Sequence, residues 1–239
     1  MITSQIITAL QEGELELHGQ FLHGSNYTFL GRVTYDGETF QAVYKPRRGE
    51  QPLWDFPEGT LAKREVAAFV LSQALGWELV PPTIYRRKGP LGPGSLQYYV
   101  EHKPGYHYFN FSPADRQLLR PVVVFDIIAN NADRKGSHVI MDPSRHLWLI
   151  DQGLCFNVDD KLRTVIWDFA GESLPDDLRT TLVMLADKLA AGGPLYLELL
   201  PLLRQGEIRA IARRAAALVE NSIFPDPPED RRPYPWPPI

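Results

Sequence analysis

The stretch NNADRKGSHVIMDPSRHLWLIDQG, residues 130–153, holds two aspartates in different surroundings. Asp133 lies in a polar run beside Arg134, whereas Asp151 directly follows the apolar run 147–150. A polar run predicts a loop, and a short apolar run bounded by turn residues predicts a buried strand. The stretch therefore predicts one carboxylate in a loop and a second one fixed at the end of a strand.

The composition is that of an ordinary globular protein. Hydrophobic residues make up 44% of the 239 positions and charged residues 23%, which is enough for a sizeable buried core. The net charge of −4 gives no basis for general nucleic-acid binding. Cys155 is the single cysteine, so no internal disulfide can form. Because the chain also shows no basic leader and no long apolar run, we expect a monomeric cytoplasmic protein without a transmembrane segment.

Hydrophobic spacing divides the chain into two unlike lobes and a tail. The first lobe, residues 1–101, reads as an amphipathic helix at 2–12, three strands within 14–45, a helix at 60–76, and strands near 81–88 and 95–101. Asp36-Gly37 predicts the hairpin between its second and third strands. The second lobe, residues 102–221, reads as helices at about 113–129, 175–191, 195–203 and 206–221, with short strands near 138–141 and 146–150. Residues 222–239 form a proline-rich tail that is either an extended wrap or a mobile end.

This order predicts an α+β, two-lobed, protein-kinase-like fold: a small antiparallel β lobe with one helix against it, then a mainly α-helical lobe. Lys45 ends the third strand, where a kinase lysine reaches the phosphates of ATP, and Glu65 lies on the next helix, where its partner is found. Either residue alone favours a solvated surface position, whereas the two together, in this order, favour the kinase assignment.

The loop between the first two strands falls where a kinase covers the phosphates. Gly24 allows close backbone approach there, and the amides of Ser25 and Asn26 are candidates for binding phosphate oxygens. No GxxxxGK[ST] or GxGxxG motif occurs in the chain, so Walker-type and Rossmann-type nucleotide sites have no support.

The two aspartates of the opening stretch match what phosphoryl transfer requires. One carboxylate must lie near the acceptor hydroxyl, and another must hold the metal that neutralises the phosphates. Asp133 in its loop and Asp151 at its strand end fit these two roles. The alternative is that Asp133 caps its own turn and that Asp151 begins an Asp-Gln-Gly β-turn. That alternative does not explain why both positions fit one scheme for phosphoryl transfer.

At these residues the sequence resembles the phosphatidylinositol 3-/4-kinase-like proteins, most nearly the type II phosphatidylinositol 4-kinases and their bacterial relatives. The resemblance covers roughly residues 14–160; it rests on NNADRKGSHVI, on LWLIDQGLCF and on REVAAFVLSQALGWELVPPT. It implies that Asp133 is the catalytic aspartate, that Arg134 beside it belongs to the catalytic residues, and that Asp151 is the magnesium ligand.

The resemblance also implies an assignment for the remaining cleft residues. Lys45 would be the phosphate lysine with Glu65 as its partner, and the segment YYVEH would be the hinge whose Val100, Glu101 and His102 contact the adenine. The implied cofactors are ATP and a divalent cation, Mg²⁺ or Mn²⁺.

One position departs from this family's pattern. Where the family carries an asparagine as a second metal ligand, the sequence has His138. Magnesium prefers oxygen ligands, whereas imidazole suits manganese and other transition metals. His138 is therefore either a ligand that alters the metal preference or a structural histidine at a strand start, in which case Ser137 or water would fill the position.

We therefore expect an ATP-dependent phosphotransferase that moves the γ-phosphate to an unidentified hydroxyl. The absence of a polybasic patch ranks a protein or small-molecule acceptor above a membrane lipid. The alternative, which His138 favours, is a catalytically inactive, nucleotide-binding pseudokinase with a regulatory role.

Overall fold

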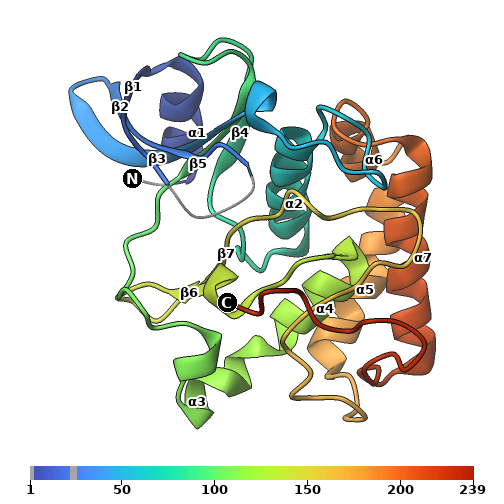
Figure 1. The fold of residues 1–239 in the computed structure, drawn as a ribbon. Coiled ribbons are helices and arrows are strands. Elements are labelled where there is room, and N and C mark those ends of the chain that lie inside the picture. Colours follow the sequence, from blue (N-terminus) through green and yellow to red (C-terminus); the bar gives the residue numbers. More distant parts are fainter. Residues whose placement is uncertain (1–2, 22–25) are drawn as a thin grey trace.

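A computed structural model describes residues 3–21 and 26–239. Figure 1 shows a sheet-containing lobe beside a larger helical lobe, with the chain crossing between them after β5. The α+β, two-lobed arrangement predicted from the sequence is confirmed.

The small lobe contains a five-stranded antiparallel sheet in the order β1-β2-β3-β5-β4. Its strands are Glu14–Gln20, Phe29–Tyr35, Glu38–Pro46, Thr83–Arg86 and Gly94–Tyr98, numbered β1 to β5 in chain order. Helix α1 (Thr3–Glu12) packs Ile6 and Leu10 into the core of this sheet. The register pairs Lys45 of β3 with Ser95 of β5, which fixes Lys45 near the end of a central strand.

The hairpin between β2 and β3 is the turn that the sequence predicted. Asp36 and Gly37 both adopt positive φ, 50° and 80°, and Tyr35 pairs directly with Glu38 across them. A two-residue turn of this kind matches the twist of the strands on either side and therefore sets their register.

Helix α2 (Leu61–Leu75) follows β3 and ends at Gly76, whose φ of 70° provides the left-handed cap. Although α2 lies next to β4 and β5, it is bonded to the large lobe. Buried Arg64 pairs with Glu207 of α7 (Gln205–Asn221) and donates to the carbonyl oxygen of Cys155 at 2.6 Å. Lys188 of α5 (Asp176–Leu189) donates to the carbonyl oxygen of Ala74. These bonds hold α2 against the helical lobe at both ends.

The large lobe is built around α4 (Arg120–Ala129), which is almost entirely buried. The helix predicted at 113–129 is divided into α3 (Pro113–Arg116), a 3-10 turn at Gln117–Leu119, and α4, because Pro121 cannot donate a backbone bond to the preceding turn. Strands β6 (Val139–Met141) and β7 (Leu147–Leu149) form a separate hairpin that precedes Asp151. Helices α5, α6 (Pro194–Leu199) and α7 close the core, and α5 packs against α7.

The proline-rich tail has no regular structure, yet it is ordered by contacts with the large lobe. From the end of α7 it runs back across α4 towards the β6–β7 hairpin (Figure 1). Of the two expectations from the sequence, the extended wrap is the one observed. Across residues 3–21 and 26–239, we find no helix with the length and apolar character needed to cross a bilayer.

Candidate active site

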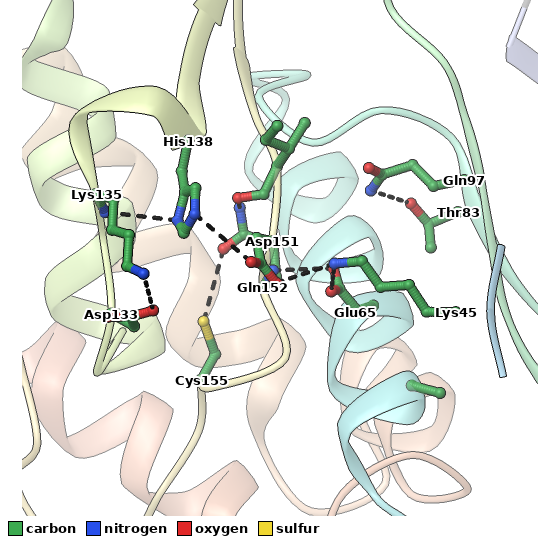
Figure 2. A network of polar contacts seen from close by, with 12 residues as sticks. Lys45, Glu65, Thr83, Gln97, Asp133, Lys135, His138, Asp151, Gln152 and Cys155 are labelled. Carbon is green, nitrogen blue, oxygen red and sulfur yellow. Dashed lines mark hydrogen bonds and ion pairs between the residues drawn. The ribbon is translucent and has the colours of Figure 1, made fainter. Parts of the chain in front are cut away.

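Three elements bring charged side chains together between the lobes. Lys45 of β3 points between Glu65 of α2 and Asp151, which follows β7, as Figure 2 shows. Its Nζ contacts Glu65 Oε1 directly and lies 2.9 Å from Asp151 Oδ1. The second oxygen of Glu65 accepts the backbone N–H of Gln152 at 2.9 Å, so α2 and the segment after β7 are tied at the same point.

Each charge in this cluster is stabilised by its neighbours. Burial alone would lower the pKa of Lys45, but the carboxylates of Asp151 and Glu65 raise it above its usual value, so the amine stays protonated. The Lys45 ammonium in turn lowers the pKa of Asp151 well below its usual range. The Asp151 side chain is 52% exposed towards the cleft, which leaves a charged carboxylate available to a ligand.

Asp133 lies in the loop after α4 and is the more protonatable of the two aspartates. Its backbone N–H donates to Asn131 Oδ1 at 2.9 Å, and its carboxylate is 3.5 Å from Lys135 Nζ. Partial burial raises its pKa to about 6, although the positive charge of Lys135 opposes this shift. A carboxylate with this pKa is ionised at neutral pH and can accept a proton.

His138 faces the same point from the start of β6. Its Nε2 is 3.5 Å from Asp151 Oδ2, and its Nδ1 is 3.5 Å from the backbone N–H of Lys135 (Figure 2). Burial lowers the pKa of His138 to about 4, so the ring is neutral at physiological pH. An Nδ1 that accepts from Lys135 leaves the proton on Nε2, where it can be donated to Asp151.

Below these residues lies an ion pair completely excluded from water. Arg134 Nε donates to both carboxylate oxygens of Asp126, at 3.1 and 3.0 Å, and both side chains have 0% exposure. Its Nη1 donates to the carbonyl oxygen of Ile150 at 3.1 Å, and its Nη2 to Gln152 Oε1 at 2.9 Å. Arg134 thus links the loop of Asp133 to the segment that carries Asp151.

The cleft around these residues has two connected parts, both lined by Lys45 and Asp151. One, of about 120 Å³, is also lined by Asn26, Glu50 and Asp133. The other, of about 480 Å³, is mostly apolar and lies between the sheet, the segment 99–104 that connects the two lobes, and the β6–β7 hairpin. Its further lining residues include Val43, Gln97, Val100, His102, Ile140 and Ile150.

The predicted nucleotide-contacting residues are found in different places. Val100 and His102 line the larger part of the cleft, whereas Glu101 is exposed and does not line it. Asn26 lines the smaller part, and its Oδ1 accepts the N–H of Gln51 at 2.7 Å. Gly24 and Ser25 lie outside the described residues.

The side chains present fit a divalent metal only together with a ligand that brings oxygens. Within the two described segments, no group of three or more His, Cys, Asp and Glu side chains converges to hold a metal by itself. Asp151 and His138 converge on one point, where Asp151 offers a carboxylate oxygen and His138 offers Nε2 only in the tautomer that gives up the bond from Lys135. Magnesium in phosphoryl-transfer sites is commonly held by one or two carboxylates plus the substrate phosphates, and this pair is compatible with that arrangement.

Two carboxylates near the site were not predicted from the sequence. Asp126 interrupts the apolar run VVVFDIIA, and a lone charge within such a helix is itself a signal for a buried partner. Glu50 accepts the backbone N–H groups of Leu61 and Ala62 at 3.2 and 2.9 Å, so it caps α2 from outside the helix. No local sequence pattern predicts such a cap, because Glu50 lies ten residues before Thr60, the residue at the N-cap position of α2.

Comparisons with known proteins give one clear relative. Protein Rv2133c of Mycobacterium tuberculosis (strain ATCC 25618 / H37Rv) is 39% identical to the chain over 95% of its length and 93% of that protein. No protein-family model matches the chain.

Among solved structures, hydra Fam20 with sugar has a TM-score of 0.55 and 14% identity, covering 92% of this chain and 87% of that one. The Helicobacter pylori proinflammatory kinase CtkA has a TM-score of 0.52 and 11% identity, covering 90% and 94%. At these identities the likeness concerns the fold alone, and it shows that the chain has an atypical kinase-like fold.

Proposed function

The chain belongs to the same family as Protein Rv2133c of Mycobacterium tuberculosis, and from this premise together with its kinase-like fold we propose that it is an ATP-dependent phosphotransferase. The observation that carries the proposal is Lys45, whose amine bridges Glu65 and Asp151 in a cleft that Asp133 also lines. A structural ion pair needs no second carboxylate at a strand end, whereas phosphate binding needs both a fixed cation and a metal-holding carboxylate.

In the proposed mechanism, the larger part of the cleft takes the adenine and the smaller part the phosphates. Lys45 neutralises phosphate charge and is itself held in place by Glu65. A divalent cation, when bound at Asp151, would neutralise the charge that develops during transfer. Asp133 accepts the proton of the acceptor hydroxyl. Arg134 contacts none of the reacting groups in this scheme; it positions Asp133 and Asp151.

The finer assignment, to the phosphatidylinositol 3-/4-kinase-like proteins, is part of the proposal and rests on the motifs at 130–156. The test of the general function is purified protein incubated with γ-labelled ATP and either Mg²⁺ or Mn²⁺, with release of ADP as the readout. Transfer of the label into a lysate of the source cell then identifies the acceptor. Absence of ADP release with both metals and with lysate present would contradict the proposal.

A second function has one specific observation in its favour. The contact of His138 Nε2 with Asp151 occupies a carboxylate oxygen that a metal would need. The alternative is therefore a pseudokinase that binds nucleotide and regulates another protein without turnover. Tight binding of ATP, measured by calorimetry, combined with no ADP release, would favour this alternative.

Lys45→Met is expected to lower ATP turnover by about 10²–10³-fold, because a fixed cation on the transferring phosphates is removed. Thermal unfolding of the variant, measured in parallel, separates this loss from a loss of fold, since the buried carboxylate of Glu65 then lacks its partner. Lys88→Met removes an exposed lysine beyond β4 and serves as the matched control. Turnover equal to that of the control would remove Lys45 from the proposed site.

His138→Asn is expected to shift the metal preference from Mn²⁺ towards Mg²⁺, because it replaces a nitrogen by a hard oxygen ligand. Binding a metal through Nε2 requires the ring tautomer opposite to the one that accepts from Lys135. Rates are measured with each metal for the wild type, for His138→Asn and for the control His18→Asn at an exposed position of β1. An unchanged Mn²⁺/Mg²⁺ ratio would leave His138 as a hydrogen-bond donor to Asp151 only.

A further inference from the structure

The C-terminal tail lies against the loop that carries Asp133. The backbone N–H of Thr164 donates to the carbonyl oxygen of Pro233 at 3.0 Å, and the N–H of Gly136 donates to that of Pro238 at 2.8 Å. Thr164 belongs to the segment that follows Asp151, and its bridge to Arg134 places that segment beside the loop that carries Asp133. The end of the tail therefore spans from one of these segments to the other, next to β6 and β7 (Figure 1).

These bonds identify the kind of ligand that this surface accepts. Both donors are main-chain amides of the large lobe, and both acceptors are carbonyl oxygens of a segment without regular secondary structure. Neither Pro233 nor Pro238 has an N–H of its own, so each can only accept. Main-chain bonds of this type hold an extended peptide largely irrespective of its sequence, as when a peptide strand is added to a sheet edge.

The tail is held in a way that permits replacement. Trp236 and Ile239 are 75% and 60% exposed, so detaching them uncovers little apolar surface. The ion pair of Arg231 with Asp160, at 2.6 Å, leaves 36% and 61% of the two side chains exposed, so solvent partly screens it. Within the described residues 229–239, Pro235 alone is buried.

We propose that the surface between the Gly136 and Thr164 amides binds a polypeptide that carries the acceptor hydroxyl, and that residues 229–239 cover this surface in its absence. This inference rests on the proposed function and gives it a substrate class: a protein, in place of a lipid or a small metabolite. In the transfer, the acceptor oxygen bonds to the γ-phosphorus of ATP and the bond to the bridging oxygen breaks. The hydroxyl proton goes to Asp133, and ADP leaves.

The binding part of the inference is tested without catalysis. The probe is a fluorescein-labelled peptide of residues 229–239, and its anisotropy is followed with the full-length chain. A loosened variant, Arg231→Ala/Pro235→Asp, is expected to bind the probe at least tenfold more tightly than the wild type. The reason is that a tethered tail competes at an effective concentration on the order of millimolar. Trp236→Ala changes an exposed tail residue and is expected to match the wild type.

Ester analogues of the probe test the register. An ester between Pro238 and Ile239 weakens the Pro238 carbonyl as an acceptor and is expected to reduce binding about fivefold. An ester between Pro235 and Trp236 weakens a carbonyl that makes no observed bond and is expected to leave binding unchanged. Equal losses from both esters would overturn the proposed register. If the double variant does not fold, the same question is decided by two other measurements. Arg231→Ala alone tests whether a loosened tail frees the surface, and the two esters test the register with the wild type.

The acceptor part is tested with dephosphorylated casein as a protein probe and phosphatidylinositol vesicles as a lipid probe. The loosened variant is expected to label casein at least threefold faster than the wild type, and the tail peptide should compete with casein but not with ATP. Label that enters vesicles only, unaffected by the tail, would overturn the inference. If no ADP is released with casein, with the vesicles or with lysate, the proposed function fails. Binding of the labelled tail peptide still decides whether the surface between Gly136 and Thr164 takes a peptide.

Discussion

Asp133→Asn is expected to lower phosphoryl transfer by about 10²–10⁴-fold, which is the usual worth of a positioned general base. The substitution keeps the size of the side chain and the backbone bond to Asn131, so the fold should be retained. ADP release under saturating ATP is the measurement. Asp187→Asn, at an exposed position of α5, is the control for a lost surface carboxylate. A rate within threefold of the control would contradict the role of Asp133.

The same residue predicts the acid side of the pH profile. Because burial raises the pKa of Asp133 to about 6, its carboxylate is mostly protonated below that pH and cannot take the proton of the acceptor hydroxyl. The ratio kcat/KM should therefore fall about tenfold for each pH unit below 6. The residual activity of Asp133→Asn should lack this fall. A wild-type profile that stays flat down to about pH 4 would show that another group is the base.

Asp126→Ala is expected to destabilise the protein by about 3–5 kcal/mol, the largest effect on stability that we anticipate, because it leaves a buried guanidinium without its counter-charge. Arg134 and Asp126 are both 0% exposed, so water cannot take over the missing bonds. Urea unfolding measures the change. The exposed pair of Arg32 with Glu16 provides the contrast, since solvent screens it and Arg32→Ala should lower the stability far less than Asp126→Ala does.

A combined variant separates charge from packing at this pair. Asp126→Leu/Arg134→Met removes both charges and fills the space with apolar groups, so it should recover much of the stability lost in Asp126→Ala. It should not recover turnover, because the bond from Arg134 to the Ile150 carbonyl, which holds the segment before Asp151, is lost. Recovery of both would show that the buried pair has no part in positioning the site.

The features of the fold that are encoded locally could be predicted from the sequence. Asp36-Gly37 specified its hairpin, Gly76 specified the end of α2, and the apolar run before Asp151 specified β7. The order of strand, helix and loop was sufficient to predict that Lys45 and Glu65 would meet, because the kinase-like layout leaves few alternatives.

The features that depend on distant parts of the chain were not predictable. The Arg64–Glu207 pair joins residues that no periodic pattern relates. Whether His138 points at Asp151 or away depends on the packing of β6 and on the N–H of Lys135. The path of the tail was equally hidden, since prolines form no repeating hydrogen bonds, and its course is set by single amides such as that of Gly136.

The attachment of α2 determines which parts of the molecule can move as rigid bodies. Arg64 and Lys188 bond α2 to the large lobe at both of its ends, whereas α2 meets β4 and β5 through packing, so a rotation between the lobes is expected to keep the helix with the large lobe. Opening of the cleft would then pull β3 away from α2 and separate Lys45 from Glu65. The Lys45–Glu65 ion pair would then form only in the closed arrangement, in which the sheet packs against α2.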